Sequence, residues 1–178
     1  MTKQEVNAAI RQGKLSTTTD WYGGFLVVFY CVCLSAASSI LIFYETTALS
    51  YRVGLILFPA SGVLSFYALY SLLKERKLTF IETSLNAAEN RKLALAAFQS
   101  LGWNIAQNSS HVILANIGAR WVGIPVHATA LLINGAIHLN LMNGGGNVKG
   151  RAPFSFGKND QKLRLLISEI NKSRQPTN

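Results

Sequence analysis

Two uncharged segments dominate the pattern of hydrophobic and polar positions along this chain. No Asp, Glu, Lys, Arg or His occurs from Trp21 to Tyr44 or from Val53 to Leu73. A helix rises about 1.5 Å per residue, so roughly 20 residues cross the apolar core of a bilayer. A helix of this length in a soluble protein normally carries a polar face, which neither segment has. The pattern therefore predicts two transmembrane helices, at about 21–44 and 53–73.

The short connection between these segments predicts an antiparallel helical hairpin. The stretch ETTALSY at 45–51, followed by Arg52, forms the predicted turn. Other Lys and Arg residues flank the opposite end of the hairpin, before the first segment and in KERK at 74–77. Basic residues beside membrane spans favour the cytoplasmic side. This asymmetry predicts a multi-pass protein of the inner (cytoplasmic) membrane with both termini in the cytoplasm.

A cleaved signal peptide is the alternative interpretation of the first segment. Phe25–Leu34 has the length of a signal-peptide core, and SAA at 35–37 resembles a cleavage site. Cleavage there would remove residues 1–37 and leave one span. The apolar run continues to Tyr44 and a second one follows, which favours an uncleaved anchor.

Small residues recur in both uncharged segments at spacings that favour close helix packing. They are expected to close the hairpin, and a second use is association between copies of the chain. No ionisable side chain lies inside either segment, which argues against a transport path. The candidate packing residues are Cys31, Ser35, Ser39, Gly54, Ser61, Ser65 and Ala68.

The residues after the hairpin predict an α+β domain with the order helix, four antiparallel strands, helix. Asn86 and Glu89 have the spacing of a capping box, and Gly102 follows the predicted helix as a C-terminal cap. Asn159 is expected to cap the last helix, which runs through Asn171. An antiparallel meander covered on one face by two helices is the natural packing.

The four predicted strands are separated by clear turn signals. WNIAQN and HVILANI flank the turn NSS, and RWVGIPVHATALLI follows a turn near Gly118. Pro125 marks a bulge or break within the third strand. Asn134-Gly135 joins the third strand to AIHLNL, as a tight hairpin requires. The chain thus divides into a cytosolic N-terminal segment (1–20), the hairpin (21–74), the cytosolic domain (75–174) and a tail (175–178).

This layout resembles a recurring type of uncharacterised small bacterial membrane protein with two spans and a C-terminal cytosolic α/β domain. The shared features are the hairpin, ENRKLALAAFQSLGW, NGAIHLN and the closing PFSFGKNDQK. The resemblance implies a compact cytosolic domain and brings no known activity with it.

The glycine-rich stretch LMNGGGNVKGRAPFSFGKND is the first candidate for binding chemistry. Gly145 and Gly150 have the spacing of a phosphate-binding loop, but Arg151 and Ala152 stand where the lysine and hydroxyl should be. The pattern therefore excludes a nucleotide-hydrolysing loop. Free glycine amides with flanking basic residues still suit an anion or a lipid headgroup, with Lys149, Arg151 and Lys158 as weak ligand candidates.

The histidines are the candidates for catalysis or metal binding. His111, His127 and His138 all lie in or beside predicted strands, without an accompanying cysteine or carboxylate pair. His138 and Asn140 share one face of their strand, which the pattern predicts to be the solvent face. Neither a metal site nor a cofactor is predicted, and no catalytic motif occurs.

The charge balance gives the leading functional hypothesis. From Lys74 to Asn178 there are 13 Lys and Arg and 5 Asp and Glu, a formal net charge of +8. A basic domain tethered to the cytoplasmic face lies close to anionic lipids, whereas its scattered basic residues do not favour nucleic acid. The hypothesis is a non-catalytic interaction module that binds a partner protein or anionic lipid. The alternatives are a small membrane-bound enzyme and a minor subunit of a membrane complex or transporter.

Overall fold

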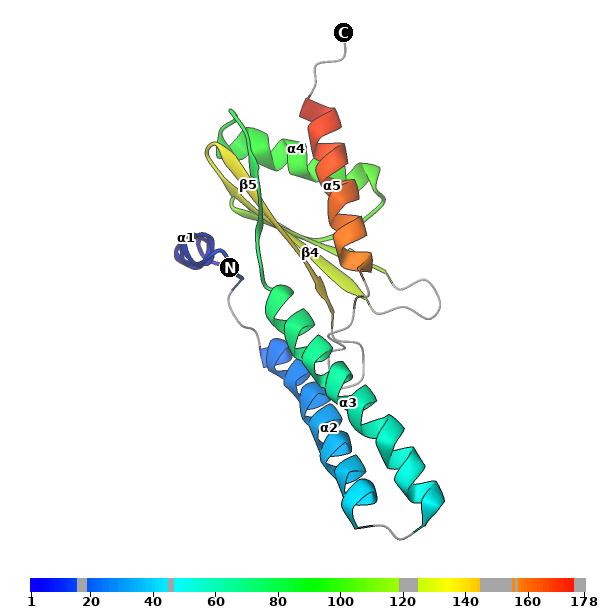
Figure 1. Ribbon diagram of the computed structural model, residues 1–178. Coiled ribbons are helices and arrows are strands. Elements are labelled where there is room, and N and C mark those ends of the chain that lie inside the picture. The colour runs from blue at the N-terminus through cyan, green and yellow to red at the C-terminus, as the bar shows by residue number, and fades with distance from the viewer. Residues whose placement is uncertain (16–18, 45–46, 119–124, 145–154, 156, 175–178) are drawn as a thin grey trace.

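The computed structural model describes residues 1–15, 19–44, 47–118, 125–144, 155 and 157–174 (Figure 1). Two long helices, α2 (Thr19–Phe43) and α3 (Ala48–Lys74), form an antiparallel hairpin that projects from an α+β domain. By length and composition, the stretches Gly24–Phe43 and Leu49–Lys74 are each able to cross a membrane. The predicted connection of 45–51 is too long, because α3 already begins at Ala48, with Thr47 as its N-cap.

The hairpin closes through small residues. A side chain at Gly54 would meet Ile42 at 2.8 Å and the backbone oxygen of Ser38 at 3.1 Å, so only glycine allows this approach. Ser38 is itself buried, although the sequence pattern did not single it out. Among the seven candidate packing residues, Cys31, Gly54, Ser61 and Ala68 are buried, while Ser35, Ser39 and Ser65 are half-buried.

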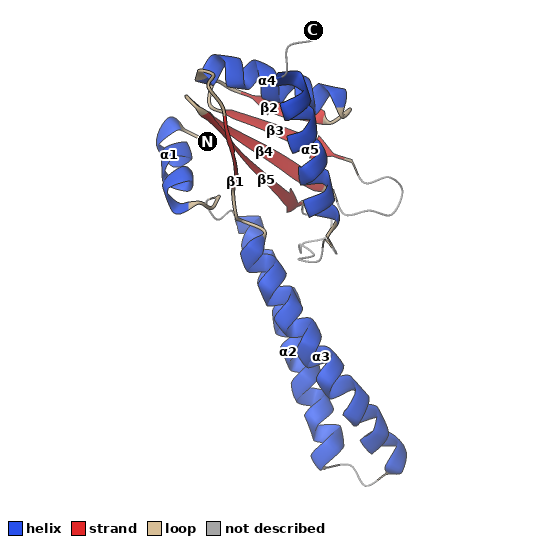
Figure 2. Ribbon diagram, turned by 45° about the horizontal axis from the view of Figure 1, so that its top comes forward, coloured by secondary structure: helices blue, strands red, loops and turns tan. Residues whose placement is uncertain are grey.

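The domain contains a five-stranded antiparallel sheet with the order β1-β5-β4-β3-β2 (Figure 2). The prediction of four strands is therefore wrong by one: β1 pairs with β5 at the edge of the sheet. β1 is only four residues long, so its alternation is too short to stand out from the exit of the hairpin. The strands are β1 (Thr79–Glu82), β2 (Asn104–Asn108), β3 (Val112–Ile117), β4 (Val126–Ile133) and β5 (Ala136–Asn143).

The turn signals in the sequence correspond to the observed strand ends. Asn134-Gly135 joins β4 to β5, with Gly135 at φ +80°, as the hairpin prediction requires. Pro125 immediately precedes β4, so the proline does not interrupt a longer strand. The register irregularity lies in β2 instead, between Ile105 and Gln107. Residues 120–124 of the predicted third strand lie outside the described residues.

Helices cover both faces of the sheet, which corrects the prediction of one covered face. On one face, α4 (Ala87–Ser100) and α5 (Lys158–Arg174) pack over Ile113, Leu132 and Leu139. On the other face, α1 (Lys3–Gln12) packs over Val112 and Leu131 (Figure 2). Adjacent strand positions are therefore both buried, so β4 and β5 are nearly continuous apolar runs.

The helix α4 begins as the capping box predicts. Asn86 accepts a hydrogen bond from the Glu89 backbone N–H, and the Glu89 carboxylate accepts one from the Asn86 N–H. Gly102, at φ +67°, follows the C-terminal end of the helix. The side chain of Asn134 accepts a hydrogen bond from Ala87 N, so the β4–β5 turn also holds the start of α4.

The exit of the hairpin is held firmly against the domain. Leu15 N donates to Arg76 O, and Leu78 N donates to Gly13 O, on either side of a bridge between Lys14 and Lys77. The Arg76 guanidinium donates twice to Leu15 O, at 2.9 and 2.6 Å. The basic stretch at 74–77 is thus part of the joint between α3, the residues after α1 and the sheet.

Candidate functional site

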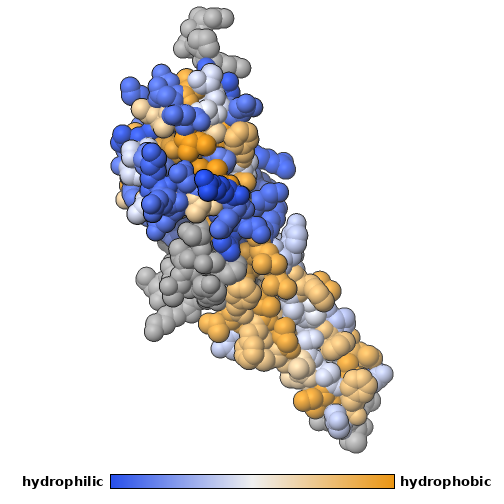
Figure 3. Space-filling model, turned by 90° about the vertical axis from the view of Figure 1, so that its left-hand side faces the viewer, coloured by the Kyte–Doolittle hydropathy of each residue, from blue (hydrophilic) through white to orange (hydrophobic). Residues whose placement is uncertain are grey.

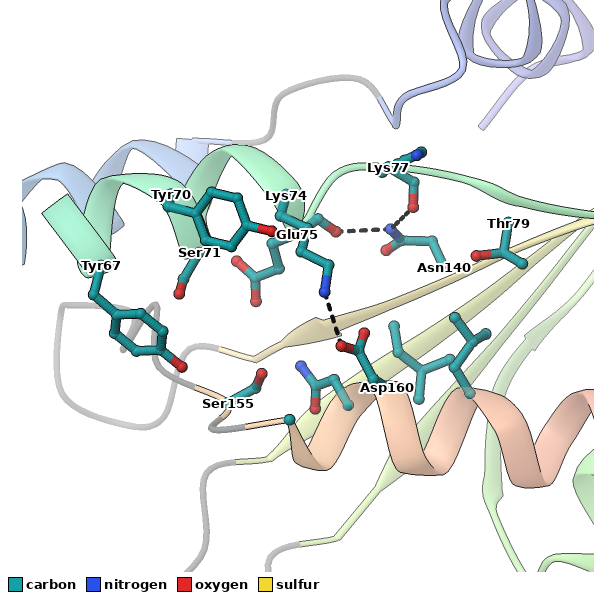
Figure 4. A pocket seen from close by; sticks show the side chains of 14 residues that line it. Tyr67, Tyr70, Ser71, Lys74, Glu75, Lys77, Thr79, Asn140, Ser155 and Asp160 are labelled. Carbon is teal, nitrogen blue, oxygen red and sulfur yellow. Dashed lines mark hydrogen bonds and ion pairs between the residues drawn. The ribbon is translucent and has the colours of Figure 1, made fainter.

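A cavity of about 270 Å³ lies where the hairpin meets the domain. The end of α3 forms one wall and the start of α5 the opposite wall, with Asn140 of β5 between them (Figure 4). Its lining residues are mostly polar and come from segments far apart in the sequence. They are Tyr67, Tyr70, Ser71, Lys74, Glu75, Lys77, Thr79, Asn140, Leu141, Ser155, Gly157, Asn159, Asp160 and Leu163.

Asn140 is the buried polar centre of this cavity. Its side-chain N–H groups donate to the backbone oxygens of Glu75 at 2.8 Å and Lys77 at 2.9 Å. These two bonds fix the amide orientation, because a flipped amide would place its oxygen against two carbonyls. The residue is 2% exposed, so the predicted solvent face of β5 is wrong at this position. The exit of the hairpin covers it.

The oxygen of the Asn140 amide is an unused hydrogen-bond acceptor. Within the described part of the chain, no group donates to Asn140 Oδ1, although the atom is buried. Figure 4 shows this oxygen on the side of the cavity where Lys74 and Glu75 lie. A buried acceptor without a donor costs about 1–3 kcal/mol. The atom has almost no accessible surface, so the unmade hydrogen bond is a cost that the fold itself carries.

Glu75 and Asn159 connect the cavity to the end of β5. The Glu75 carboxylate accepts a hydrogen bond from Asn143 N at 2.6 Å. The Asn143 side-chain oxygen accepts one from Asn159 Nδ2 at 2.9 Å. Asn159 was predicted to cap α5, but the helix begins at Lys158 and Asn159 is buried in its first turn. Its amide binds to the sheet rather than to its own helix.

An ion pair crosses the cavity between the two helices. Lys74 Nζ lies 2.8 Å from Asp160 Oδ2, and both side chains are about half exposed. The Lys77 ammonium points away from the cavity, so this residue contributes its backbone carbonyl (Figure 4). Among the described residues of the lining, the acidic side chains are those of Glu75 and Asp160.

The structure describes one of the three anion ligands that the sequence pattern suggests. Lys149 and Arg151 lie outside the described residues. Lys158 is exposed at the start of α5, beside the cavity but not in its lining. The cavity residues Glu75, Asn140 and Asp160 were not predicted. The one available signal was an asparagine inside the apolar run of β5.

The three histidines are not brought together. His127 pairs with Asn116, its Nδ1 lying 2.6 Å from Asn116 Oδ1, at the start of β4. His138 lies beside Phe80, with ring centres 5.2 Å apart, and burial lowers its pKa. In register, His138 is opposite Leu131, four positions along β4 from His127, or roughly 13 Å at the strand rise. Among the described residues, no group of three His, Cys, Asp or Glu is placed to hold a metal ion.

No protein-family model matches the sequence, and no curated protein matches it either. The resemblance to two-span bacterial membrane proteins remains an expectation from sequence features.

Proposed function

We propose that this chain is a two-span protein of the cytoplasmic membrane that holds a non-catalytic interaction domain against anionic lipid headgroups. The observation that carries the proposal is the exposure of the hairpin. In the most apolar stretch of α2 only 11% is buried, and in that of α3 only 17% is buried. A core helix of a soluble protein would be mostly buried, whereas apolar side chains cover much of the face of the hairpin that Figure 3 shows.

Individual side chains on α3 illustrate this exposure. Ile56, Val63 and Phe66 are 70%, 70% and 78% exposed. They span ten positions in the middle of α3, so the exposed apolar surface extends over about three turns of the helix. A bilayer removes such a surface from water at about 25 cal/mol per Å².

The end of the domain that meets the hairpin carries a basic collar, which we define as Lys14, Lys74, Lys77, Lys158 and Lys162. The backbones of Lys14 and Lys77 form an isolated β-bridge. Lys74 forms an ion pair with Asp160, which is two residues after Lys158 on α5. With the hairpin in a bilayer, this end faces the headgroups. Each basic residue near an anionic leaflet contributes about 1 kcal/mol of attraction.

Two lysines of the collar, Lys158 and Lys162, would be stabilised by a bound anion. Burial lowers the pKa of Lys162, and the charge of Lys158, one turn earlier on α5, lowers it further. Like charges four residues apart on a helix repel each other. A lipid phosphate between them would offset both effects. The same basic end also suits an acidic partner protein, which is the second form of the interaction hypothesis.

The rigid joint at the hairpin exit supports a fixed orientation of the domain. The bonds of Arg76 to Leu15 and of Asn140 to the exit backbone hold the residues after α3 directly against the domain. We propose that both termini lie in the cytoplasm and that α5 begins at the membrane side.

Charge reversal at the collar tests this proposal. In Lys162→Glu, we expect the full chain in neutral micelles to bind short-chain phosphatidylglycerol about fivefold more weakly, as loss of about 1 kcal/mol implies. The matched control is Lys172→Glu, ten residues further along the same helix and roughly 15 Å away. High salt should weaken binding by the unchanged chain. An equal loss of affinity in both variants, or an affinity that does not depend on salt concentration, would contradict a collar that faces the headgroups.

A further inference from the structure

We propose that the cavity between α3 and α5 binds the glycerol headgroup of an anionic phospholipid, of the phosphatidylglycerol class, through the hydroxyl groups that line it. This inference rests on the proposed function and names the lipid more closely. The basic collar responds to the charge of a lipid, whereas the cavity distinguishes lipids of equal charge by the hydroxyl groups of their headgroups.

Hydroxyl groups are the commonest polar groups in the lining of the cavity. They belong to Tyr67, Tyr70, Ser71, Thr79 and Ser155. The first three come from the end of α3, the fourth from β1 and the last from the residues just before α5. A hydroxyl group both donates and accepts hydrogen bonds. Such a lining therefore suits a ligand that also carries hydroxyl groups, because each contact can then join a donor to an acceptor.

The ion pair that crosses the cavity favours an uncharged group over an ion. Lys74 Nζ lies 2.8 Å from Asp160 Oδ2, and the pair connects α3 to α5 (Figure 4). A small ion bound to either partner would compete with this pair, whereas a diol leaves it intact. Within the described part of the chain, the pair uses one carboxylate oxygen of Asp160 and one N–H of Lys74. Both groups therefore keep the capacity to bind a hydroxyl group.

The position of the cavity indicates that the hydroxyl groups belong to a lipid. Tyr67 and Tyr70 line it from the last two turns of α3 and are 37% and 63% exposed. Tyrosines at the end of a spanning helix lie at headgroup level. On the opposite wall, Lys158 of the collar stands between two lining residues, Gly157 and Asn159. A phosphate at the edge of the cavity therefore lies near the collar, with its glycerol extending inward.

The size of the cavity agrees with such a headgroup. Its volume of about 270 Å³ is far above the roughly 10–15 Å³ that one water requires. It is slightly below the usual range for drug-sized ligands, which begins near 300 Å³. A glycerol headgroup is smaller than such ligands, and the acyl chains remain in the bilayer beside α3.

Removal of the hydroxyl groups from the lipid provides a direct test. The full chain in neutral micelles is titrated with short-chain phosphatidylglycerol and with phosphatidylpropanol, which has the same phosphodiester charge and no headgroup hydroxyl. We expect phosphatidylglycerol to bind about tenfold more tightly, because the other lipid leaves polar groups of the site without a partner. Equal affinity for the two lipids would overturn the inference.

Two substitutions locate this preference in the cavity. Tyr70→Phe and Ser71→Ala each remove one hydroxyl group and little else. We expect the double variant to bind phosphatidylglycerol about tenfold more weakly and to change its affinity for phosphatidylpropanol by less than about twofold. Tyr51→Phe, near the other end of α3, is the control and should keep the full preference. If the double variant keeps it too, or loses affinity for both lipids equally, the hydroxyl site is not in the cavity.

Tail-free glycerophosphoglycerol separates a lipid from a soluble polyol phosphate. Affinity equal to that of the lipid would overturn the assignment to a headgroup, and much weaker binding supports it. Salt-sensitive binding of phosphatidylglycerol and phosphatidylpropanol with equal affinity would remove this inference alone and leave the proposed function in place. If the unchanged chain binds neither lipid, the lipid form of the proposed function is contradicted together with the inference.

Discussion

Arginine in place of Val63 is expected to prevent stable membrane insertion of the chain. Val63 lies near the middle of α3 and is 70% exposed, so the new charge would face lipid. An arginine at the centre of a span costs about 2.5–3.5 kcal/mol on insertion scales. The measurement is the fraction of chain that stays in membranes after an alkaline carbonate wash, together with its thermal stability in nanodiscs.

The matched control for this variant is Leu165→Arg on α5. Leu165 is also an exposed apolar residue on a helix, at 57%, but it belongs to the domain. This control should stay in the membrane fraction in the same amount as the unchanged chain. If Val63→Arg instead stays in the membrane fraction in the same amount as this control, the account of α3 as a membrane span is wrong.

Leucine in place of Asn90 is expected to destabilise the domain by about 3–5 kcal/mol. Asn90 is fully buried in α4 and its side chain donates to the backbone oxygens of Leu85, Ile133 and Ala136. Its oxygen accepts a hydrogen bond from Thr83 at 2.8 Å. Each buried polar group left without a partner costs about 1–3 kcal/mol, and some of these groups will find water.

The thermal midpoint of the full chain in detergent measures this loss. The control is Asn104→Leu, because Asn104 is an exposed residue of β2. A surface substitution of this kind usually changes stability by less than about 0.5 kcal/mol. If the two variants melt at the same temperature, the Asn90 network does not hold α4 to the β4–β5 turn.

Local signals in the sequence predicted much of the fold. The uncharged segments indicated both long helices, and the Asn86 capping box and the Asn134-Gly135 pair fixed one helix start and one hairpin. These features succeed because each depends on residues that are close in sequence. The partner of an edge strand is not local, which is why β1 was missed: only its pairing with β5 identifies it.

The candidate site could not be predicted for the same physical reason. Its acceptors come from the end of α3, from β5 and from the first turn of α5, and only the fold brings them together. The sequence pattern treats KERK only as a basic flank of the hairpin, yet Arg76 donates to Leu15 O and Glu75 accepts from Asn143 N. Asn140 is buried because the residues after α3 lie over β5 and accept its hydrogen bonds. The alternation of residues within one strand cannot predict a contact with a segment so distant in sequence.

The central claim, a two-span anchor with its domain in the cytoplasm, is tested most directly by cysteine accessibility in intact cells. Cys31 and Cys33 are first replaced by alanine, and a single cysteine is placed at Leu49 or at Ser84. Leu49 is 73% exposed at the start of α3, and Ser84 is exposed between β1 and α4. A membrane-impermeant maleimide should label Leu49→Cys in intact cells and Ser84→Cys only after lysis. Labelling of Ser84→Cys in intact cells, with Leu49→Cys protected, would contradict the account and would fit the reverse topology.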